Sequence, residues 1–249
     1  MAIEVGQHNL EIQDNAKRWE RKPLLQQVYA DFYRIIAGQL RRDLPGATVE
    51  IGSGIGNLKA VVPHALATDI FPNPWLDQVE NAYALSFADR SIANLILFDV
   101  WHHLQFPGTA LAEFHRVLLP GGRLVVFDPA MGLLGRCVYG LFHHEPLGLA
   151  DEIQWRAPKD FSPDDMTYYA AQGNAQRVFW TEEFAAQLSD WSIVRRDLFA
   201  GLPYIASGGF RGPQLYPQRL HGLLAAVDRA ANMAPKLFAT RLLVALEKK

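Results

Sequence analysis

The residues best suited to chemistry form a glycine-rich stretch, in which Gly52, Gly54 and Gly56 follow the apolar segment that ends at Ile51. Glycine allows the backbone a positive φ and lets a ligand approach where a Cβ would otherwise stand. The dinucleotide pattern G-x-G-x-x-G serves a pyrophosphate and would place its third glycine at position 57, which is Asn57 here. The spacing therefore favours a ligand other than a dinucleotide.

Two carboxylates accompany this loop. Glu50 directly precedes it, and Asp69 lies 17 residues after Gly52, at the predicted end of the next strand. An acid in that position can accept hydrogen bonds from ribose hydroxyls. The pair suits a ligand that carries a ribose and a positive charge.

Histidines form a second group of candidates. His102 and His103 follow the most clearly apolar segment of the chain, and His143 and His144 precede Glu145. Histidine titrates near neutral pH, so each of the four is a candidate general base. Local packing or hydrogen bonding is the favoured explanation of the first pair. The second pair could be a base with its orienting acid or part of a metal site, but solvated or structural histidines are favoured there as well. Because adjacent histidines rarely direct both rings at one ion, we predict no metal site.

The pattern of apolar residues predicts the elements that position these groups. Residues 94–98 form the continuous apolar run typical of a strand buried on both faces of a parallel sheet, and the spacing over 24–40 predicts a helix. Further strands are predicted at 48–51, 65–70, 83–87, 123–127, 192–198 and 240–246, and further helices at 57–62, 109–118, 181–188 and 220–231.

This alternation predicts an α/β fold: a doubly wound, mostly parallel seven-stranded sheet with helices on both faces and a lid insertion after the fifth strand. Ligands in such folds bind beyond the carboxyl ends of the strands. We expect a single domain over residues 1–249, with an N-terminal helical segment at 1–46. Lid or substrate-binding insertions are expected at 131–180 and 201–235.

Residues 49–129 closely resemble the Rossmann-like S-adenosylmethionine-dependent methyltransferases, in particular the small-molecule branch called type 11. The matching segments occur in the family's order and spacing, and they are residues 50–56, 68–70, 81–89, 101–104 and 113–122. This chain departs from the family pattern at Asn81, Ser86 and Ala93, where aspartate, proline and aspartate are usual.

The resemblance implies S-adenosyl-L-methionine as cofactor and S-adenosyl-L-homocysteine as product. Carried over by position, the cofactor-binding residues are Glu50, Gly52, Ser53, Gly54, Gly56, Asp69, Ile70, Asn81, Ala82 and Phe98. The loop would line the methionine and ribose portion, Asp69 would bind the ribose, and Ile70 would flank the adenine. Asn81 can still accept a hydrogen bond from the adenine amine through its amide oxygen.

The amino-acid composition limits the kinds of partner that we expect the protein to bind. The chain of 249 residues has 24 basic and 26 acidic residues, so it lacks the basic field needed to hold nucleic acid. A membrane span is not expected because no apolar run reaches about 18 residues. The single cysteine, Cys137, rules out an internal disulfide and fits a cytoplasmic location.

We expect a small-molecule acceptor, with an oxygen of a natural product, sugar or lipid-linked intermediate as the favoured group. The helix predicted at 220–231 could pack on the sheet, cover the site or form a homodimer contact. Two alternatives remain open: a regulatory protein that binds S-adenosylmethionine without turnover, and a nicotinamide-dependent oxidoreductase, which the loop spacing disfavours.

Overall fold

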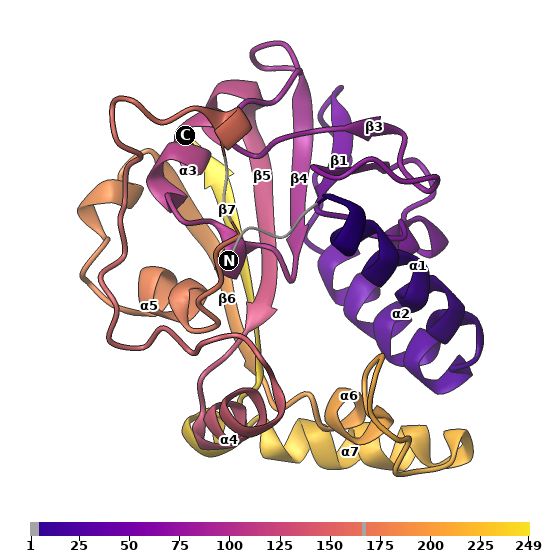
Figure 1. The fold of residues 1–249 in the computed structure, drawn as a ribbon. Coiled ribbons are helices and arrows are strands. Elements are labelled where there is room, and N and C mark those ends of the chain that lie inside the picture. Colours follow the sequence, from indigo (N-terminus) through magenta and orange to yellow (C-terminus); the bar gives the residue numbers. More distant parts are fainter. Residues whose placement is uncertain (1–4, 166–167) are drawn as a thin grey trace.

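A seven-stranded sheet forms the centre of the computed structural model, which describes residues 5–165 and 168–249 (Figure 1). The strands are β1 (Ala47–Ile51), β2 (Leu66–Asp69), β3 (Gln78–Val79), β4 (Ile92–Phe98), β5 (Leu118–Pro129), β6 (Trp191–Phe199) and β7 (Arg241–Lys248). Their spatial order is β3-β2-β1-β4-β5-β7-β6, and only β7 runs antiparallel to its neighbours. The predicted mostly parallel, seven-stranded α/β sheet is confirmed.

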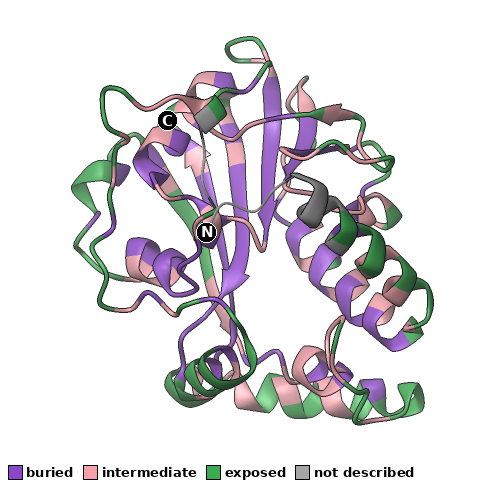
Figure 2. Cartoon of the chain, in the orientation of Figure 1, coloured by how far each residue is buried: buried purple, intermediate pink, exposed green. Residues whose placement is uncertain are grey.

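Both faces of the sheet are covered by helices. Leu95 and Leu97 of β4 join the apolar cluster that includes residues of α3 (Pro107–Val117) and α5 (Asn174–Trp180). Ile96 and Phe98 point to the opposite face, as the two-residue period of a strand requires, and join the cluster formed with α2 (Pro23–Ala37). Every residue of β4 is accordingly buried (Figure 2).

The N-terminal helices are α1 (Val5–Glu20) and α2, which lie side by side in Figure 1. Helix α2 begins with Pro23 at its first turn, where the missing N–H costs nothing, and buries Leu25, Val28 and Phe32. It ends at Ala37, three residues before the predicted end of the helix over 24–40.

Two predicted elements are wrong. Residues 83–87 are not a strand, because a bridge between Asn81 and Ala84 turns the chain and the Leu85 N–H donates to Glu113 Oε1 (2.7 Å). The two-residue β3 fills the edge of the sheet instead. Residues 181–188 form turns and a short 3-10 helix (Ala186–Leu188). The Thr181 hydroxyl donates back to the Arg177 carbonyl (2.7 Å), so it follows α5 rather than capping a new helix.

The segment predicted as a helix at 57–62 is shortened to a 3-10 turn (Asn57–Ala60). The remaining helices are α4 (Leu133–Phe142), α6 (Leu202–Ser207), α7 (His221–Ala231) and α8 (Pro235–Phe238). Helices α4, α6 and α7 lie at the end of the sheet toward which the β5 arrow points (Figure 1). The two segments predicted as insertions thus contribute helices beside the carboxyl ends of the parallel strands.

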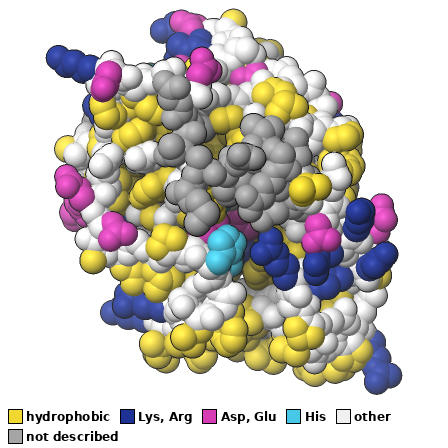
Figure 3. Space-filling view, in the orientation of Figure 1, with side chains coloured by type: hydrophobic (Ala, Val, Ile, Leu, Met, Phe, Trp, Pro, Cys, Tyr) yellow, Lys and Arg dark blue, Asp and Glu magenta, His cyan; other side chains and the backbone are white. Residues whose placement is uncertain are grey.

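Apolar side chains are exposed on these added helices, among them Leu141, Phe142, Leu223 and Val227. Hydrophobic side chains extend along the lower edge of the molecule in Figure 3. No helix within residues 5–165 and 168–249 has the length and apolar character needed to cross a bilayer.

Candidate functional site

The glycine loop follows β1, and three alternate residues in it have a left-handed backbone conformation. They are Gly52 (φ 71°), Gly54 (φ 54°) and Gly56 (φ 69°). A Cβ on Gly52 would stand 2.4 Å from Val100 Cγ2, so this glycine allows the loop to pack against the segment that follows β4. A Cβ on Gly54 would meet no atom within 4 Å. Gly54 therefore borders open space that a ligand can enter.

Asp69 holds the loop in place. Its Oδ2 accepts a hydrogen bond from the Gly54 N–H (3.0 Å), and its Oδ1 accepts one from the Phe71 N–H (3.3 Å). The Ser53 N–H donates to the Thr68 carbonyl (2.8 Å), which ties the loop to β2 as well. The structure thus brings together the glycine loop and the acid that the sequence pairs with it.

Two buried oxygens beside the loop lack partners among the described residues: Glu50 Oε2 and Ser53 Oγ. Burial, reinforced by the charge of Asp69, raises the pKa of Glu50 to about 8. A buried polar atom without a partner costs about 1–3 kcal/mol. Both atoms are therefore available to a polar ligand.

The other predicted cofactor residues are Ile70, Asn81, Ala82 and Phe98. Asn81 donates through Nδ2 to the Pro163 carbonyl (3.0 Å), and its Oδ1 accepts from the Tyr83 N–H (2.9 Å). Ala82 packs against the apolar cluster under α3, and Ile70 is half-buried. The Phe98 ring belongs to the opposite cluster, where it stacks on Phe127 with centroids 5.3 Å apart.

The four candidate histidines converge on one carboxylate, Glu145. His102 Nε2 lies 3.6 Å from Glu145 Oε2, and His103 Nε2 lies 3.9 Å from Oε1. His143 Nδ1 is 3.6 Å and His144 Nε2 is 4.0 Å from the same carboxylate. His102 and Glu145 are buried, whereas the His144 side chain is 66% exposed.

Two main-chain hydrogen bonds join the segment that carries Glu145 to the turn Trp101–His103 by way of residues 171 and 172. The Ala171 N–H donates to the His102 carbonyl (2.9 Å), and the Gln172 N–H donates to the Pro146 carbonyl (3.1 Å). These bonds place Glu145 beside the histidines that follow β4.

Charges within the cluster are unequal. Burial opposes a charge on His102, but the carboxylates of Asp128 and Glu145 outweigh it and raise the His102 pKa to about 10. Burial likewise favours neutral Glu145, but the histidines hold its pKa below its usual range. Burial, with help from His144 and His102, lowers the pKa of His143. With its proton in place, His102 cannot act as a general base at neutral pH.

Sequence reasoning missed three charged residues at this edge of the sheet. Asp99 directly follows β4 in a left-handed conformation (φ 56°) and is bound by the buried guanidinium of Arg241. Arg241 also lies over the Tyr204 ring, 4.4 Å from its centroid. Asp128, near the end of β5, is bonded to His102. The signal available was an acid at the carboxyl end of each of two adjacent apolar strands.

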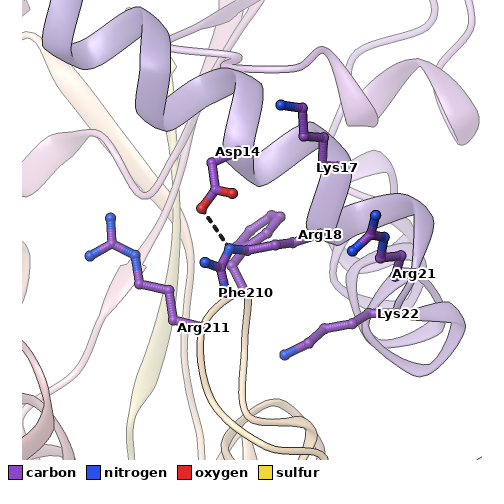
Figure 4. Close-up of a pocket in the computed structure, with 7 residues that line it drawn as sticks. All are labelled: Asp14, Lys17, Arg18, Arg21, Lys22, Phe210 and Arg211. Atoms are coloured by element: carbon purple, nitrogen blue, oxygen red, sulfur yellow. Dashed lines mark hydrogen bonds and ion pairs between the residues drawn. The ribbon is translucent and has the colours of Figure 1, made fainter.

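A separate, basic pocket lies between α1 and the loop near Phe210 (Figure 4). It is lined by Asp14, Lys17, Arg18, Arg21, Lys22, Phe210 and Arg211. None of the predicted site residues, all of which the structure describes, lines this pocket.

Comparisons with known proteins agree with this geometry. Residues 49–126 match the family model described as a methyltransferase domain. No curated protein matches the sequence. Among solved structures, a geranyl diphosphate methyltransferase in complex with S-adenosylmethionine aligns with a TM-score of 0.52 and 11% identity, covering 88% of this chain and 85% of that one.

Two other structures are similar. A methyltransferase of Thermotoga maritima described as a possible histamine N-methyltransferase has a TM-score of 0.52 and 15% identity, covering 96% and 99% of the two chains. The geranyl diphosphate C-methyltransferase of Streptomyces coelicolor A3(2), in complex with Mg²⁺, geranyl diphosphate and S-adenosylhomocysteine, has a TM-score of 0.53 and 11% identity, covering 89% and 79%.

At such low identities the solved structures establish the fold, while the family match covers the strands that carry the glycine loop and Asp69. The predicted resemblance is confirmed. Residues 49–126 carry a methyltransferase domain, and the chain has the Rossmann-like fold of solved S-adenosylmethionine-dependent methyltransferases.

Proposed function

We propose that this methyltransferase acts on a small molecule, with an oxygen of a natural product, sugar or lipid-linked intermediate as the methyl acceptor, bound at the histidines around Glu145. The observation that carries the proposal is the position of this cluster. β1 and β4 are neighbours, Gly52 contacts Val100, and His102 follows two residues later. Donor and acceptor sites would therefore share one edge of the sheet.

The residues around the glycine loop fit S-adenosylmethionine. Gly54 leaves room for the ligand, and Asp69 is held where it can accept from ribose hydroxyls. Glu50 and Ser53 each have a side-chain oxygen with no partner among the described residues. The cofactor supplies a methyl group activated by its sulfonium. In this proposal Gly52 and Gly56 shape the loop, while Ile70, Asn81 and Ala82 line the adenine. Phe98, the last residue of β4, packs in the core and supports the site from there.

The acceptor side is polar, which favours an oxygen-bearing substrate. Tyr168 donates through its hydroxyl and Gln172 through its amide to Glu145, so the carboxylate is fixed in orientation. The lid over residues 131–180 would exclude water from the reaction, and alignment of donor and acceptor would supply much of the rate enhancement. Residues 201–235 are proposed as a second part of the same cover, and the homodimer and the cytoplasmic location stay predictions.

Turnover with hydroxyl-bearing acceptors tests this function. We expect release of S-adenosylhomocysteine when the purified protein is given S-adenosylmethionine and a panel of phenols, sugars and lipid-linked sugars. A His103→Ala variant should lose at least about 100-fold in kcat/KM, because the acceptor would lose its contact, whereas the exposed His64→Ala should react like the wild type. Binding of the donor without turnover on this panel and on host extracts would favour the regulatory alternative.

A further inference from the structure

We propose that His102, His103 and Glu145 bind one divalent transition-metal ion of the zinc and iron(II) type. Their donor atoms, two imidazole nitrogens and one carboxylate oxygen, all lie within 4.8 Å of one another. Two histidines and one carboxylate form a donor set used by catalytic zinc and by non-haem iron sites, which keep positions open for substrate. Mg²⁺ prefers oxygen donors and would not select the imidazoles.

The two rings are oriented as metal ligands usually are. The His103 Nδ1 lies 2.9 Å from the Tyr169 carbonyl oxygen. A carbonyl can only accept a hydrogen bond, so Nδ1 carries a proton, and Nε2 is the ring nitrogen that faces Glu145, 3.9 Å from its Oε1. His102 uses Nδ1 in the same way, toward Asp128 Oδ1 at 3.0 Å. Metal-bound histidines characteristically donate their other N–H to a carboxylate or a backbone carbonyl.

The carboxylate has the same kind of support. Tyr168 and Gln172 donate to the two different oxygens of Glu145 and so fix the plane of the group. Glu145 is 9% exposed and His102 is 4% exposed, while His103 is half-buried and borders the opening.

Charge balance points to a dication. Asp128 and Glu145 are two buried carboxylates, and Arg241 is already paired with Asp99. Buried charges are costly unless they are paired. One proton on His102 offsets one of the two negative charges, whereas a divalent ion bound to two neutral histidines offsets both.

The sequence did not indicate this site because adjacent histidines rarely direct both rings at one ion. In the proposed site the 3-10 turn Trp101–His103 sets the two rings side by side, with centroids 4.0 Å apart, so that both can approach the same ion. The third donor comes from the lid. The inferred role of the ion, holding and polarising the acceptor oxygen, rests on the proposed function, whereas binding of the ion does not.

Cobalt(II) binding to the untagged, full-length protein tests the site, because Co²⁺ occupies zinc and iron sites and has visible d–d absorption. We expect one Co²⁺ per chain with a spectrum typical of mixed nitrogen and oxygen ligands, displaced by Zn²⁺ but not by Mg²⁺. Elemental analysis of the protein purified without chelator should then show which ion, zinc or iron, it carries.

Variants locate the ion. His103→Ala should weaken Co²⁺ binding at least about 100-fold, and Glu145→Gln should do the same. Asp128→Asn should weaken it about 10–100-fold by releasing His102. His64→Ala, which removes an exposed histidine elsewhere, should leave it unchanged.

S-adenosylmethionine affinity serves as the check on folding, and it should persist in His103→Ala. Failure to bind Co²⁺ at one equivalent, or binding unaffected by both His103→Ala and Glu145→Gln, overturns the ion site even if methyl transfer is observed. Metal binding without methyl transfer would instead refute the proposed acceptor chemistry alone.

Discussion

Gly54→Val is expected to weaken S-adenosylmethionine binding by at least about 100-fold, or about 2.7 kcal/mol. The position has φ 54°, a conformation that a β-branched residue adopts only with strain, and an added side chain would enter the open space beside the loop. The Gly54 N–H bond to Asp69 would also be disturbed. Isothermal titration calorimetry measures the affinity, and thermal unfolding verifies that the variant is folded.

Gly222→Val is the matched control. Gly222 lies exposed in α7, outside the positive-φ glycines, and a Cβ there also meets no atom within 4 Å. We expect it to leave the affinity unchanged. A folded Gly54→Val variant that binds the cofactor as tightly as Gly222→Val would place the ligand elsewhere.

Asp99→Asn is expected to lower the free energy of unfolding by about 3–5 kcal/mol, because the buried Arg241 would lose the carboxylate, itself 28% exposed, that offsets its charge. Arg241 is 2% exposed and Asp99 is bound to its Nη1, while its Nε has no partner among the described residues. Asparagine tolerates the positive φ of this position, so the change removes mainly the charge. Urea unfolding followed by circular dichroism gives the free energy.

The exposed pair Arg195 and Asp197 provides the comparison, since its members are 50% and 32% exposed. Asp197→Asn should cost no more than about 1 kcal/mol. The double variant Asp99→Asn with Arg241→Met should recover part of the stability, because no uncompensated charge then remains buried. Equal losses in Asp99→Asn and Asp197→Asn would contradict the importance assigned to the buried pair.

The strands at the centre of the sheet were predictable because burial on both faces leaves a continuous apolar run, as in residues 94–98. The edge was not. Leu85 is buried, but the contact that fixes its backbone is a hydrogen bond to Glu113 on a helix, and an apolar pattern cannot distinguish that from a strand. The helix expected at 181–188 failed for a similar reason, since Thr181 bonds backward to α5.

The candidate site shows the same division between local and long-range information. The glycine loop and Asp69 follow neighbouring strands of the sheet, so their spacing along the chain was sufficient to predict that they lie together. The histidines could be found only as two separate pairs. Their meeting at Glu145 depends on bonds such as that from the Ala171 N–H to the His102 carbonyl, which join segments 69 residues apart and leave no pattern in the sequence.

Proton release on cofactor binding tests most directly that the methyl donor binds beside the glycine loop. Glu50 has a pKa of about 8 in the free protein, so it is mostly neutral at pH 7. A positively charged donor at this site favours the ionised carboxylate, so binding should expel a proton, and the affinity should rise with pH until about pH 8 and then level off.

The measurement is calorimetric titration of S-adenosylmethionine at pH 7 in two buffers of different ionisation enthalpy. We predict one cofactor per chain, with close to one more proton released by the wild type than by Glu50→Gln. Equal proton release by the two proteins would contradict the account. So would a cofactor that binds in the basic pocket of Figure 4 instead of beside the glycine loop.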